Sequence, residues 1–130
     1  MYFPAGTYLI SSPIILYYMT NMVGNFHNPM PVLKASASFP ANAIALVDAD
    51  QYTSANPTYV TTNVFYRQVR NLVFDMTSVP SGNLVRGIHW PTAQATSLQN
   101  CVFKMSTASG NQHVGVFIEN GKHWWRLSRE

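Results

Sequence analysis

The chain has 130 residues, 47% of them hydrophobic, which is enough apolar material for one modest folded domain and too much for a disordered segment. Only 10% of the residues are charged, compared with about 25% in an average soluble domain. Most of the net charge of +3 lies in residues 122–130, which carry +2, so the nearly neutral remainder argues against a nucleic-acid or anionic-membrane surface.

The first residues, Met-Tyr-Phe-Pro-Ala-Gly, have neither the basic start nor the apolar stretch of a signal peptide, so none is expected. No run of 18 apolar residues follows, which excludes a membrane-spanning helix. Short segments rich in β-branched and aromatic residues predict strands over 7–10, 14–18, 63–69, 71–76 and 114–118. Helix is expected only as single turns within 41–49 and 91–98, and 50–57 is typical of a polar loop.

An internal repeat connects the later strands. The segment 71–77, Asn-Leu-Val-Phe-Asp-Met-Thr, recurs at 100–106 as Asn-Cys-Val-Phe-Lys-Met-Ser, a shift of 29 residues. Residues 87–90, Gly-Ile-His-Trp, recur at 115–118 as Gly-Val-Phe-Ile, a shift of 28. A period of this size, built from short strands without long helices, predicts stacked coils that pair through parallel strands.

Stacked coils place specific residues next to each other. Val73 with Val102, and Phe74 with Phe103, are expected to lie one above another at the strand spacing of about 4.8 Å. A leucine-rich horseshoe fits worse because its leucine ladder is absent. A β-sandwich is the remaining alternative, since short strands at this spacing also suit that class. The sequence therefore predicts an all-β fold and favours a parallel β-helix.

Several segments carry a resemblance to a known family. They are residues 2–11 (Tyr-Phe-Pro-Ala-Gly-Thr-Tyr-Leu-Ile-Ser), 21–24 with 31–35, 87–100 (Gly-Ile-His-Trp-Pro-Thr-Ala-Gln-Ala-Thr-Ser-Leu-Gln-Asn) and 115–121. The first resembles the sequence that opens the coils of the pectate-lyase-like superfamily of right-handed parallel β-helix proteins. Together they resemble the fungal exo-β-1,3-glucanases of glycoside hydrolase family fifty-five, and 90–100 is the most specific part.

The resemblance implies a domain organisation. Residues 1–121 would form part of the first of two right-handed, single-stranded parallel β-helix domains, which lie side by side in these secreted enzymes with the sugar site between them. The second β-helix domain, which carries the general-acid Glu in the family, is expected to be missing from this truncated solenoid. Residues 122–130 depart from the glycine- and serine-rich continuation of the family and are predicted to be a non-family tail.

The most specific segment also supplies the candidate sugar-binding residues. In the family, the first domain is thought to lend polar side chains that orient the attacking water and the terminal sugar, and the resemblance points to Gln94 and then Gln99. An amide can both donate and accept hydrogen bonds without titrating. A glutamine ladder inside the coil stack, or a turn cap, is the open alternative. His89 and Trp90 would add a hydrogen bond and a stacking face, unless Trp90 packs against the next coil.

Acidic residues are few: Asp48, Asp50, Asp75, Glu119 and Glu130. Inverting hydrolysis needs two carboxyl groups roughly 6.5 to 9.5 Å apart, and no acid in this chain is assigned a catalytic role. Glu119 is expected to face solvent. No metal ligand and no cofactor is predicted, because the spacing of Asp48 and Asp50, although it suits a calcium site, is more typical of a loop acid pair.

The resemblance thus implies a fragment of a secreted, extracellular glycoside hydrolase that acts on β-1,3-glucan and is inactive by itself. Its partner would be a β-glucan polysaccharide or oligosaccharide. Two alternatives stay open. One is a calcium-dependent polysaccharide lyase of the pectate-lyase kind, with Arg86 as the base. The other is a noncatalytic β-helix that binds carbohydrate.

Overall fold

The computed structural model describes residues 1–53, 56–57, 64–91, 95–119 and 125–127. These residues form strands, turns and bends, and none of them belongs to a helix with the length and apolarity to cross a membrane. The strands are β1 (Tyr2–Phe3), β2 (Thr7–Ile10), β3 (Ile14–Ile15), β4 (Met22–Gly24), β5 (Val32–Ala35), β6 (Val47–Asp48), β7 (Tyr52–Thr53), β8 (Asn56–Pro57), β9 (Gln68–Asp75), β10 (Arg86–His89), β11 (Thr96–Lys104), β12 (Val114–Phe117) and β13 (Trp125–Leu127).

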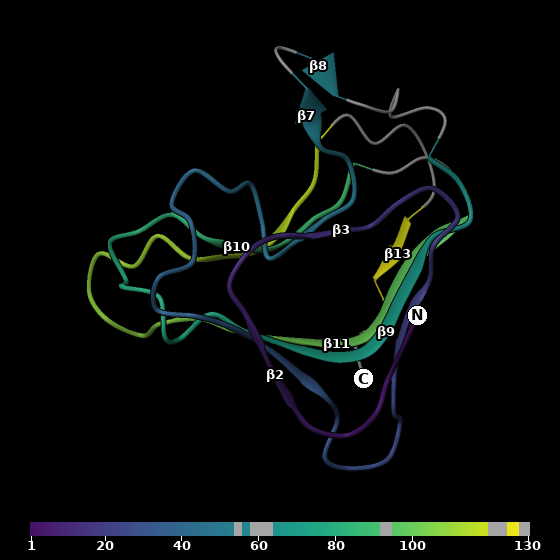
Figure 1. Ribbon diagram of the computed structural model, residues 1–130, viewed down its shortest axis with the longest axis horizontal. Helices are drawn as coiled ribbons and strands as arrows, with labels where there is room; N and C mark the ends of the chain where they lie inside the picture. The colour runs from purple at the N-terminus through teal and green to yellow at the C-terminus, as the bar shows by residue number, and fades with distance from the viewer. Residues whose placement is uncertain (54–55, 58–63, 92–94, 120–124, 128–130) are drawn as a thin grey trace.

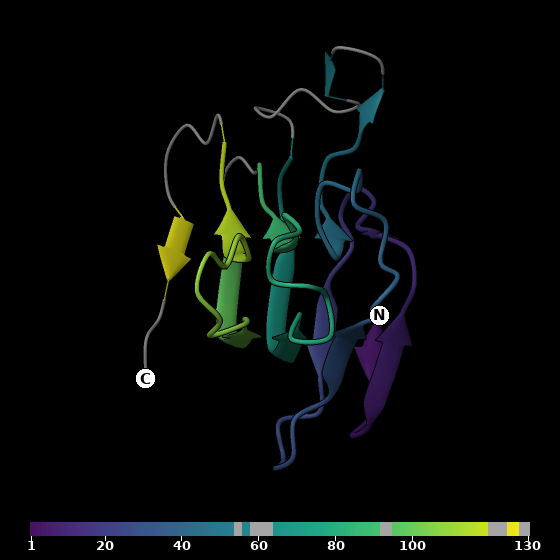
Figure 2. The same cartoon turned by 90° about the vertical axis from the view of Figure 1, so that its left-hand side faces the viewer.

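Two parallel sheets run along the stack of coils. The larger, sheet A, has the order β1-β4-β9-β11-β13, and β5 pairs with both β2 and β9 at its side. The smaller, sheet B, has the order β12-β10-β6-β3. The described strands of both sheets pair in parallel, whereas β7 and β8 form an antiparallel hairpin. Successive coils superimpose along the stack (Figure 1) and lie side by side after a turn of 90° (Figure 2).

The register of the sheets confirms the internal repeat. Val73 pairs with Val102 and Phe74 pairs with Phe103, which is the shift predicted from the sequence. In sheet B, β10 pairs with β12 at a shift of 28 residues, which is the second shift predicted from the sequence. Equivalent side chains of successive coils therefore lie one above another. The fold is the predicted all-β parallel β-helix.

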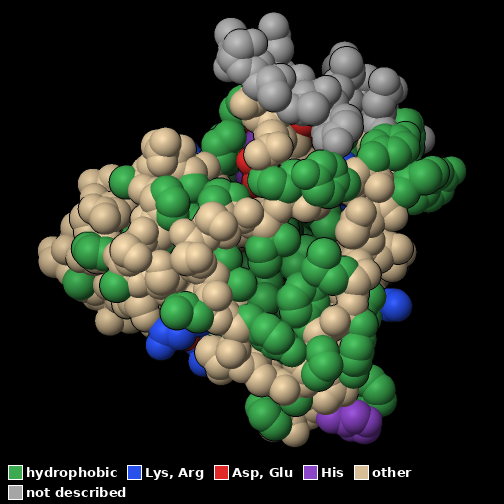
Figure 3. Space-filling view, in the orientation of Figure 1, with side chains coloured by type: hydrophobic (Ala, Val, Ile, Leu, Met, Phe, Trp, Pro, Cys, Tyr) green, Lys and Arg blue, Asp and Glu red, His purple; other side chains and the backbone are tan. Residues whose placement is uncertain are grey.

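The core fills the interior of the coils. Leu33 of β5, Leu72 and Phe74 of β9, and Ile88 of β10 are fully buried. Figure 3 shows hydrophobic side chains gathered inside the outline of the coil on the face that Figure 1 presents. Sheets A and B thus contribute to one hydrophobic core, and burial of these side chains is the main stabilising term of the fold.

Residues with a left-handed backbone conformation form a column at the corner where successive coils bend before they enter sheet A. Its members are Met19, Tyr66 and Ala95, with φ of 55°, 55° and 57°. Each lies three residues before a member of the register column Met22, Val69 and Leu98. The bend is therefore repeated at the same level in successive coils, without glycine, at a cost of roughly 1–2 kcal/mol per residue.

A second column bends the strands of sheet A. Asn71 and Asn100 adopt φ of 57° and 48°, a conformation that asparagine tolerates better than most residues. The Asn100 amide donates a hydrogen bond of 2.9 Å to Asn71 Oδ1, and the Asn71 amide donates one of 3.3 Å to the carbonyl of Gly24. This asparagine ladder joins the bends of three successive coils.

The two helical turns expected from the sequence are wrong for the described residues. Residues 41–49 form turns and bends that lead into β6, and the chain enters β11 at Thr96. Their backbone groups bond to other coils: the N–H of Leu46 donates to the carbonyl of Arg86 at 2.8 Å, and that of Ser97 to the carbonyl of Arg67 at 3.0 Å. Hydrogen bonds between coils therefore take the place of those of a helix.

Two strands are shorter than predicted. The strand expected over 14–18 ends as β3 at Ile15, because a turn follows in which the N–H of Thr20 donates to the carbonyl of Tyr17 at 3.2 Å. The strand expected over 63–69 starts as β9 only at Gln68, since the left-handed Tyr66 interrupts an extended backbone.

Candidate functional site

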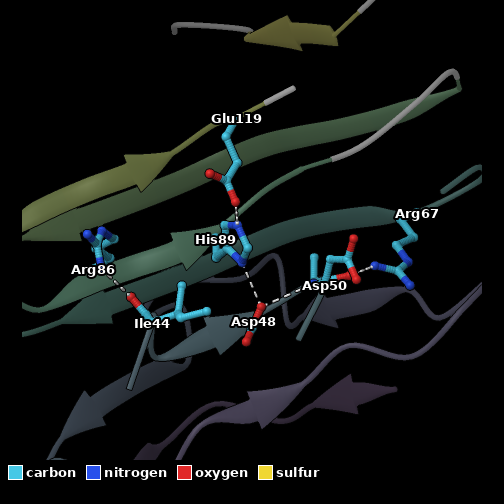
Figure 4. A network of polar contacts seen from close by, with 8 residues as sticks. Ile44, Asp48, Asp50, Arg67, Arg86, His89 and Glu119 are labelled. Atoms are coloured by element: carbon cyan, nitrogen blue, oxygen red, sulfur yellow. Dashed lines mark hydrogen bonds and ion pairs between the residues drawn. The ribbon is translucent and has the colours of Figure 1, made fainter. Parts of the chain in front are cut away.

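Polar side chains gather where the strands of sheet B end. Asp48 is the last residue of β6, His89 is the last residue of β10, and the two are register partners in neighbouring coils. Phe117 ends β12 and pairs with His89 on the other side. Glu119 follows two residues later in the coil of β12. Figure 4 shows His89 between Asp48 and Glu119.

Both ring nitrogens of His89 contact a carboxyl group. Nδ1 lies 2.7 Å from Asp48 Oδ1, and Nε2 lies 2.9 Å from Glu119 Oε1. A neutral imidazole has only one N–H, whereas the two hydrogen bonds need two hydrogens. The second proton must therefore reside on the ring or on one of the two carboxyl groups. We refer to Asp48, His89 and Glu119 as the polar ladder, because it joins three successive coils.

Two aromatic rings lie next to the imidazole of His89. The Phe117 ring stacks on His89 with centroids 5.3 Å apart, and the Tyr52 ring lies tilted at 5.6 Å. The Arg86 guanidinium lies 4.5 Å from the centroid of Phe117 and donates a hydrogen bond of 3.1 Å to the carbonyl of Ile44. The imidazole is fully buried, so neither ring nitrogen is presented to solvent.

A second acid and an arginine lie beside the polar ladder. Asp50 and Arg67 are both buried, with 1% and 0% of their surfaces exposed. The backbone N–H of Asp50 donates to Asp48 Oδ1 at 3.1 Å, and the Arg67 guanidinium donates to the carbonyl of Ala49. Figure 4 shows the Arg67 side chain pointing toward this acidic segment. Two carboxyl groups and one guanidinium thus lie within a largely buried corner.

Glu119 differs from its expected solvent-facing position. The structure corrects that expectation, because its carboxyl bonds to His89 and only 26% of its side chain is exposed. Burial raises the pKa of Glu119, and the nearby charges of Asp50 and Asp48 raise it further. No local sequence pattern indicates this contact, because His89 and Glu119 are 30 residues apart and meet through the pairing of β10 with β12.

Two of the predicted sugar-site residues, His89 and Trp90, are buried. His89 and Trp90 are consecutive, and Trp90 is 1% exposed, with its backbone N–H donating to the carbonyl of Phe117 at 2.8 Å. The surroundings of Trp90 thus match the packing alternative. Gln99 is exposed on β11 of sheet A, where its amide donates to Ser97 Oγ at 3.2 Å. Gln94 lies outside the described residues, in the connection between β10 and β11.

Neither part of the calcium-lyase arrangement stands free. Asp48 Oδ1 lies 2.7 Å from His89 Nδ1 and accepts a hydrogen bond from the backbone N–H of Asp50, and the Arg86 guanidinium donates to the carbonyl of Ile44. In the portion of the chain with described coordinates, no three His, Cys, Asp or Glu side chains converge as metal ligands would. The geometry instead suits hydrogen bonding and proton sharing.

Comparison with known proteins identifies relatives over most of the chain. A family model described as Rhamnogalacturonase A/epimerase, pectate lyase-like, matches residues 1–126, which extends past the predicted boundary at 121. Strand β13 in this region pairs in parallel with β11. The boundary between residues 121 and 122 stays a prediction.

Three curated relatives are identical to this chain at close to half of the aligned positions. "Glucan 1,3-beta-glucosidase" of Cochliobolus carbonum is 47% identical over 123 residues, covering 93% of this chain and 15% of the relative. "Probable glucan endo-1,3-beta-glucosidase" of Arthroderma benhamiae is 45% identical over 93% of this chain and 14% of the relative. "Non-secreted LysM effector LysM15" of Penicillium expansum is 44% identical over 93% of this chain and 8% of the relative. The chain therefore spans only a small part of the relatives it matches.

Proposed function

The chain belongs to the Rhamnogalacturonase A/epimerase, pectate lyase-like family, and from this membership we propose that it is the β-1,3-glucan-binding part of a glycoside hydrolase. The observation that carries the proposal is the 47% identity, over 93% of the chain, to a protein named glucan 1,3-beta-glucosidase. The low charge of the chain supports the same substrate class, because a glucan is an uncharged polymer rich in hydroxyl groups.

The proposed sugar site contains Gln94, Gln99, His89 and Trp90. The two amides are proposed to contact sugar hydroxyls, since they donate and accept hydrogen bonds at any physiological pH. The exposure of Gln99 supports this role. His89 and Trp90 are both buried and are proposed to support the site from within the coil rather than to contact the sugar directly.

We assign no catalytic residue to this chain. The proposed hydrolase would take its general acid from a second β-helix domain, as the family resemblance implies. The isolated 130 residues are then expected to bind glucan without cleaving it. We place the parent protein outside the cell, since secretion is what the family resemblance implies.

Incubation of the purified chain with laminarin, a β-1,3-glucan, tests this proposal. We expect retention of laminarin without glucose release, with or without calcium. Gln99→Ala should weaken retention, whereas Gln112→Ala, which changes an exposed glutamine beyond sheet A, should not. Calcium-dependent cleavage that yields unsaturated products would support the lyase alternative. Binding of other polysaccharides in preference to laminarin would support the noncatalytic carbohydrate-binding alternative.

A further inference from the structure

Exposed aromatic and large apolar side chains lie at the corner where two successive coils bend into sheet A. Tyr17, Tyr18 and Met19 are 62%, 42% and 58% exposed, and Tyr66, one coil further along, is 61% exposed. Phe65 is half-buried, and its ring centroid lies 6.1 Å from that of Tyr66. Figure 3 shows hydrophobic side chains projecting at the upper right, where Figure 1 places the turn after β3. We refer to these five residues as the aromatic corner.

The register of sheet A places the two halves of the aromatic corner side by side. Because β4 pairs with β9, Met19 and Tyr66 occupy equivalent places in neighbouring coils, about 4.8 Å apart along the stack. Both have a φ of 55°. Tyr18 and Phe65, which directly precede them, are equivalent in the same way. The aromatic corner is therefore one surface that spans two coils.

The backbone at Tyr66 indicates that its side chain is kept for something other than the fold. A left-handed conformation strains a bulky residue, whereas glycine or asparagine adopts it more readily. The ring is 61% exposed, so burial within this chain does not offset the strain. Strained residues of this kind cluster at ligand-binding sites. A ligand that covers the ring accounts for a tyrosine at this position.

The chemistry of the aromatic corner selects an uncharged ligand. Segments 16–22 and 64–66 contain no charged residue. Arg67, next to Tyr66, is buried and donates to the carbonyl of Ala49, so its charge faces the interior (Figure 4). A tyrosine offers an apolar ring face and a hydroxyl that donates and accepts hydrogen bonds. A sugar ring offers the complement, with C–H groups on its faces and hydroxyl groups around its rim.

The aromatic corner is continuous with the exposed part of β11. The residue equivalent to Tyr66 in the next coil is Ala95, which shares the left-handed conformation and is exposed. Gln99 is exposed four residues later, about 13 Å away along the strand direction. A chain of sugar rings that contacts Gln99 can thus pass the small side chain of Ala95 and reach Tyr66. This continuity favours a polysaccharide over a compact ligand.

We propose that the aromatic corner is a glucan-binding surface, on which Tyr17 and Tyr66 stack against sugar rings of a β-1,3-glucan. This inference rests on the proposed glucan function. It extends that function to a surface that the family resemblance does not assign, and it gives the surface a role in binding rather than in cleavage.

The first test measures the affinity of the full 130-residue chain for laminaripentaose by calorimetry. Tyr66→Asn removes the ring and keeps a residue that tolerates the left-handed backbone, so the fold should persist while affinity falls roughly three- to tenfold. Tyr66→Phe keeps the ring and should retain affinity within about twofold. Leu84→Ala is the matched control, because it truncates a side chain that is 41% exposed beyond the far end of β9, and it should bind like the unmodified chain.

Hydroxyl-radical footprinting gives a second readout that needs no variant. Laminaripentaose should protect Tyr17 and Tyr66 from modification, whereas Phe26, which is 70% exposed between β4 and β5, should be modified equally with and without the sugar. Binding with neither tyrosine protected, and with Tyr66→Asn equal to the unmodified chain, would overturn the inference and leave the glucan function intact.

Two further outcomes separate the alternatives. Failure of the unmodified, folded chain to bind laminaripentaose would overturn both the inference and the glucan function. Sedimentation of the unmodified chain and of Tyr66→Asn tests whether a second copy covers the surface instead. Self-association that Tyr66→Asn abolishes, together with unchanged affinity for laminaripentaose, would assign the aromatic corner to contact between copies and overturn the inference.

Discussion

The rings of Phe74 and Phe103 are stacked, with centroids 4.8 Å apart and planes 13° from parallel. The two residues are register partners in β9 and β11. Their separation equals the spacing of neighbouring strands, so each ring repeats the place of the other one coil further along the stack. The contact between the two rings follows directly from the sequence repeat. We therefore expect this pair to stabilise the stacking of the two coils.

Phe74→Ala should strongly destabilise the chain. Phe74 is fully buried, so its truncation removes both apolar burial and the stacking contact, and we expect a loss of about 3–5 kcal/mol in unfolding free energy. Urea unfolding followed by circular dichroism measures this loss. Val102→Ala, at a register position that is 41% exposed, should cost about 0.5 kcal/mol. Equal losses in the two variants would contradict the assignment of Phe74 to the core.

Gly24→Ala should also be poorly tolerated. A Cβ at Gly24 would lie 1.8 Å from the carbonyl oxygen of Asn71, a backbone atom held by the pairing of β4 with β9. We expect a loss of about 3 kcal/mol, because the two coils would have to separate locally. Gly82→Ala is the matched control, since a Cβ there meets nothing within 4 Å. A thermal midpoint equal to that of the control would show that this close approach is wrong.

Ala95→Gly should stabilise the chain. Ala95 adopts a φ of 57°, which is strained for alanine but not for glycine, so relief of this strain should exceed the added flexibility of the unfolded chain by about 0.5–1 kcal/mol. Ala37→Gly changes an exposed turn residue without a positive φ and should destabilise the chain by a similar amount. Chemical unfolding of both variants checks the opposite signs. A destabilising Ala95→Gly would argue against the left-handed column at this corner.

Asp75 should make the stability of the chain depend on pH. It lies in register between Lys34 and Lys104. Burial by itself would raise the pKa of Asp75, but hydrogen bonds from Thr77 and the two lysines lower it below its ordinary value. A lowered folded-state pKa contributes stability at neutral pH that is lost as the pH falls through that pKa. Asp75→Asn should therefore be less stable by about 0.5–1 kcal/mol near neutral pH, with the difference vanishing in acid. A difference that persisted in acid would assign the effect to something other than charge.

The coil register could be predicted from the sequence because β9 and β11 carry nearly the same residues at the same offset. The shift of 29 residues from Asn71 to Asn100 predicts how the residues of β9 pair with those of β11. The bends were not predictable in the same way. Met19, Tyr66 and Ala95 share a left-handed conformation but no chemical similarity, so their equivalence emerges only once the register is known.

The contact between Asp48 and His89 in the polar ladder could not be predicted from the sequence for a related reason. Asp48 and His89 are 41 residues apart, which departs from the period of the repeat because the β7–β8 hairpin and its flanks intervene. No offset in the sequence therefore aligns them. Once β10 and β12 are paired, however, the position of Glu119 near His89 follows from the second predicted shift. Extending that shift two residues past Phe117 is the signal that could have found it.

Side-by-side binding of laminarin and of polygalacturonate to the full chain, measured by calorimetry without calcium, tests the central claim most directly. The account predicts saturable binding of laminarin and no binding of the acidic polymer, because the proposed site offers the neutral amides of Gln94 and Gln99 rather than a cluster of cations. Binding of polygalacturonate in preference to laminarin would contradict the assignment to β-1,3-glucan.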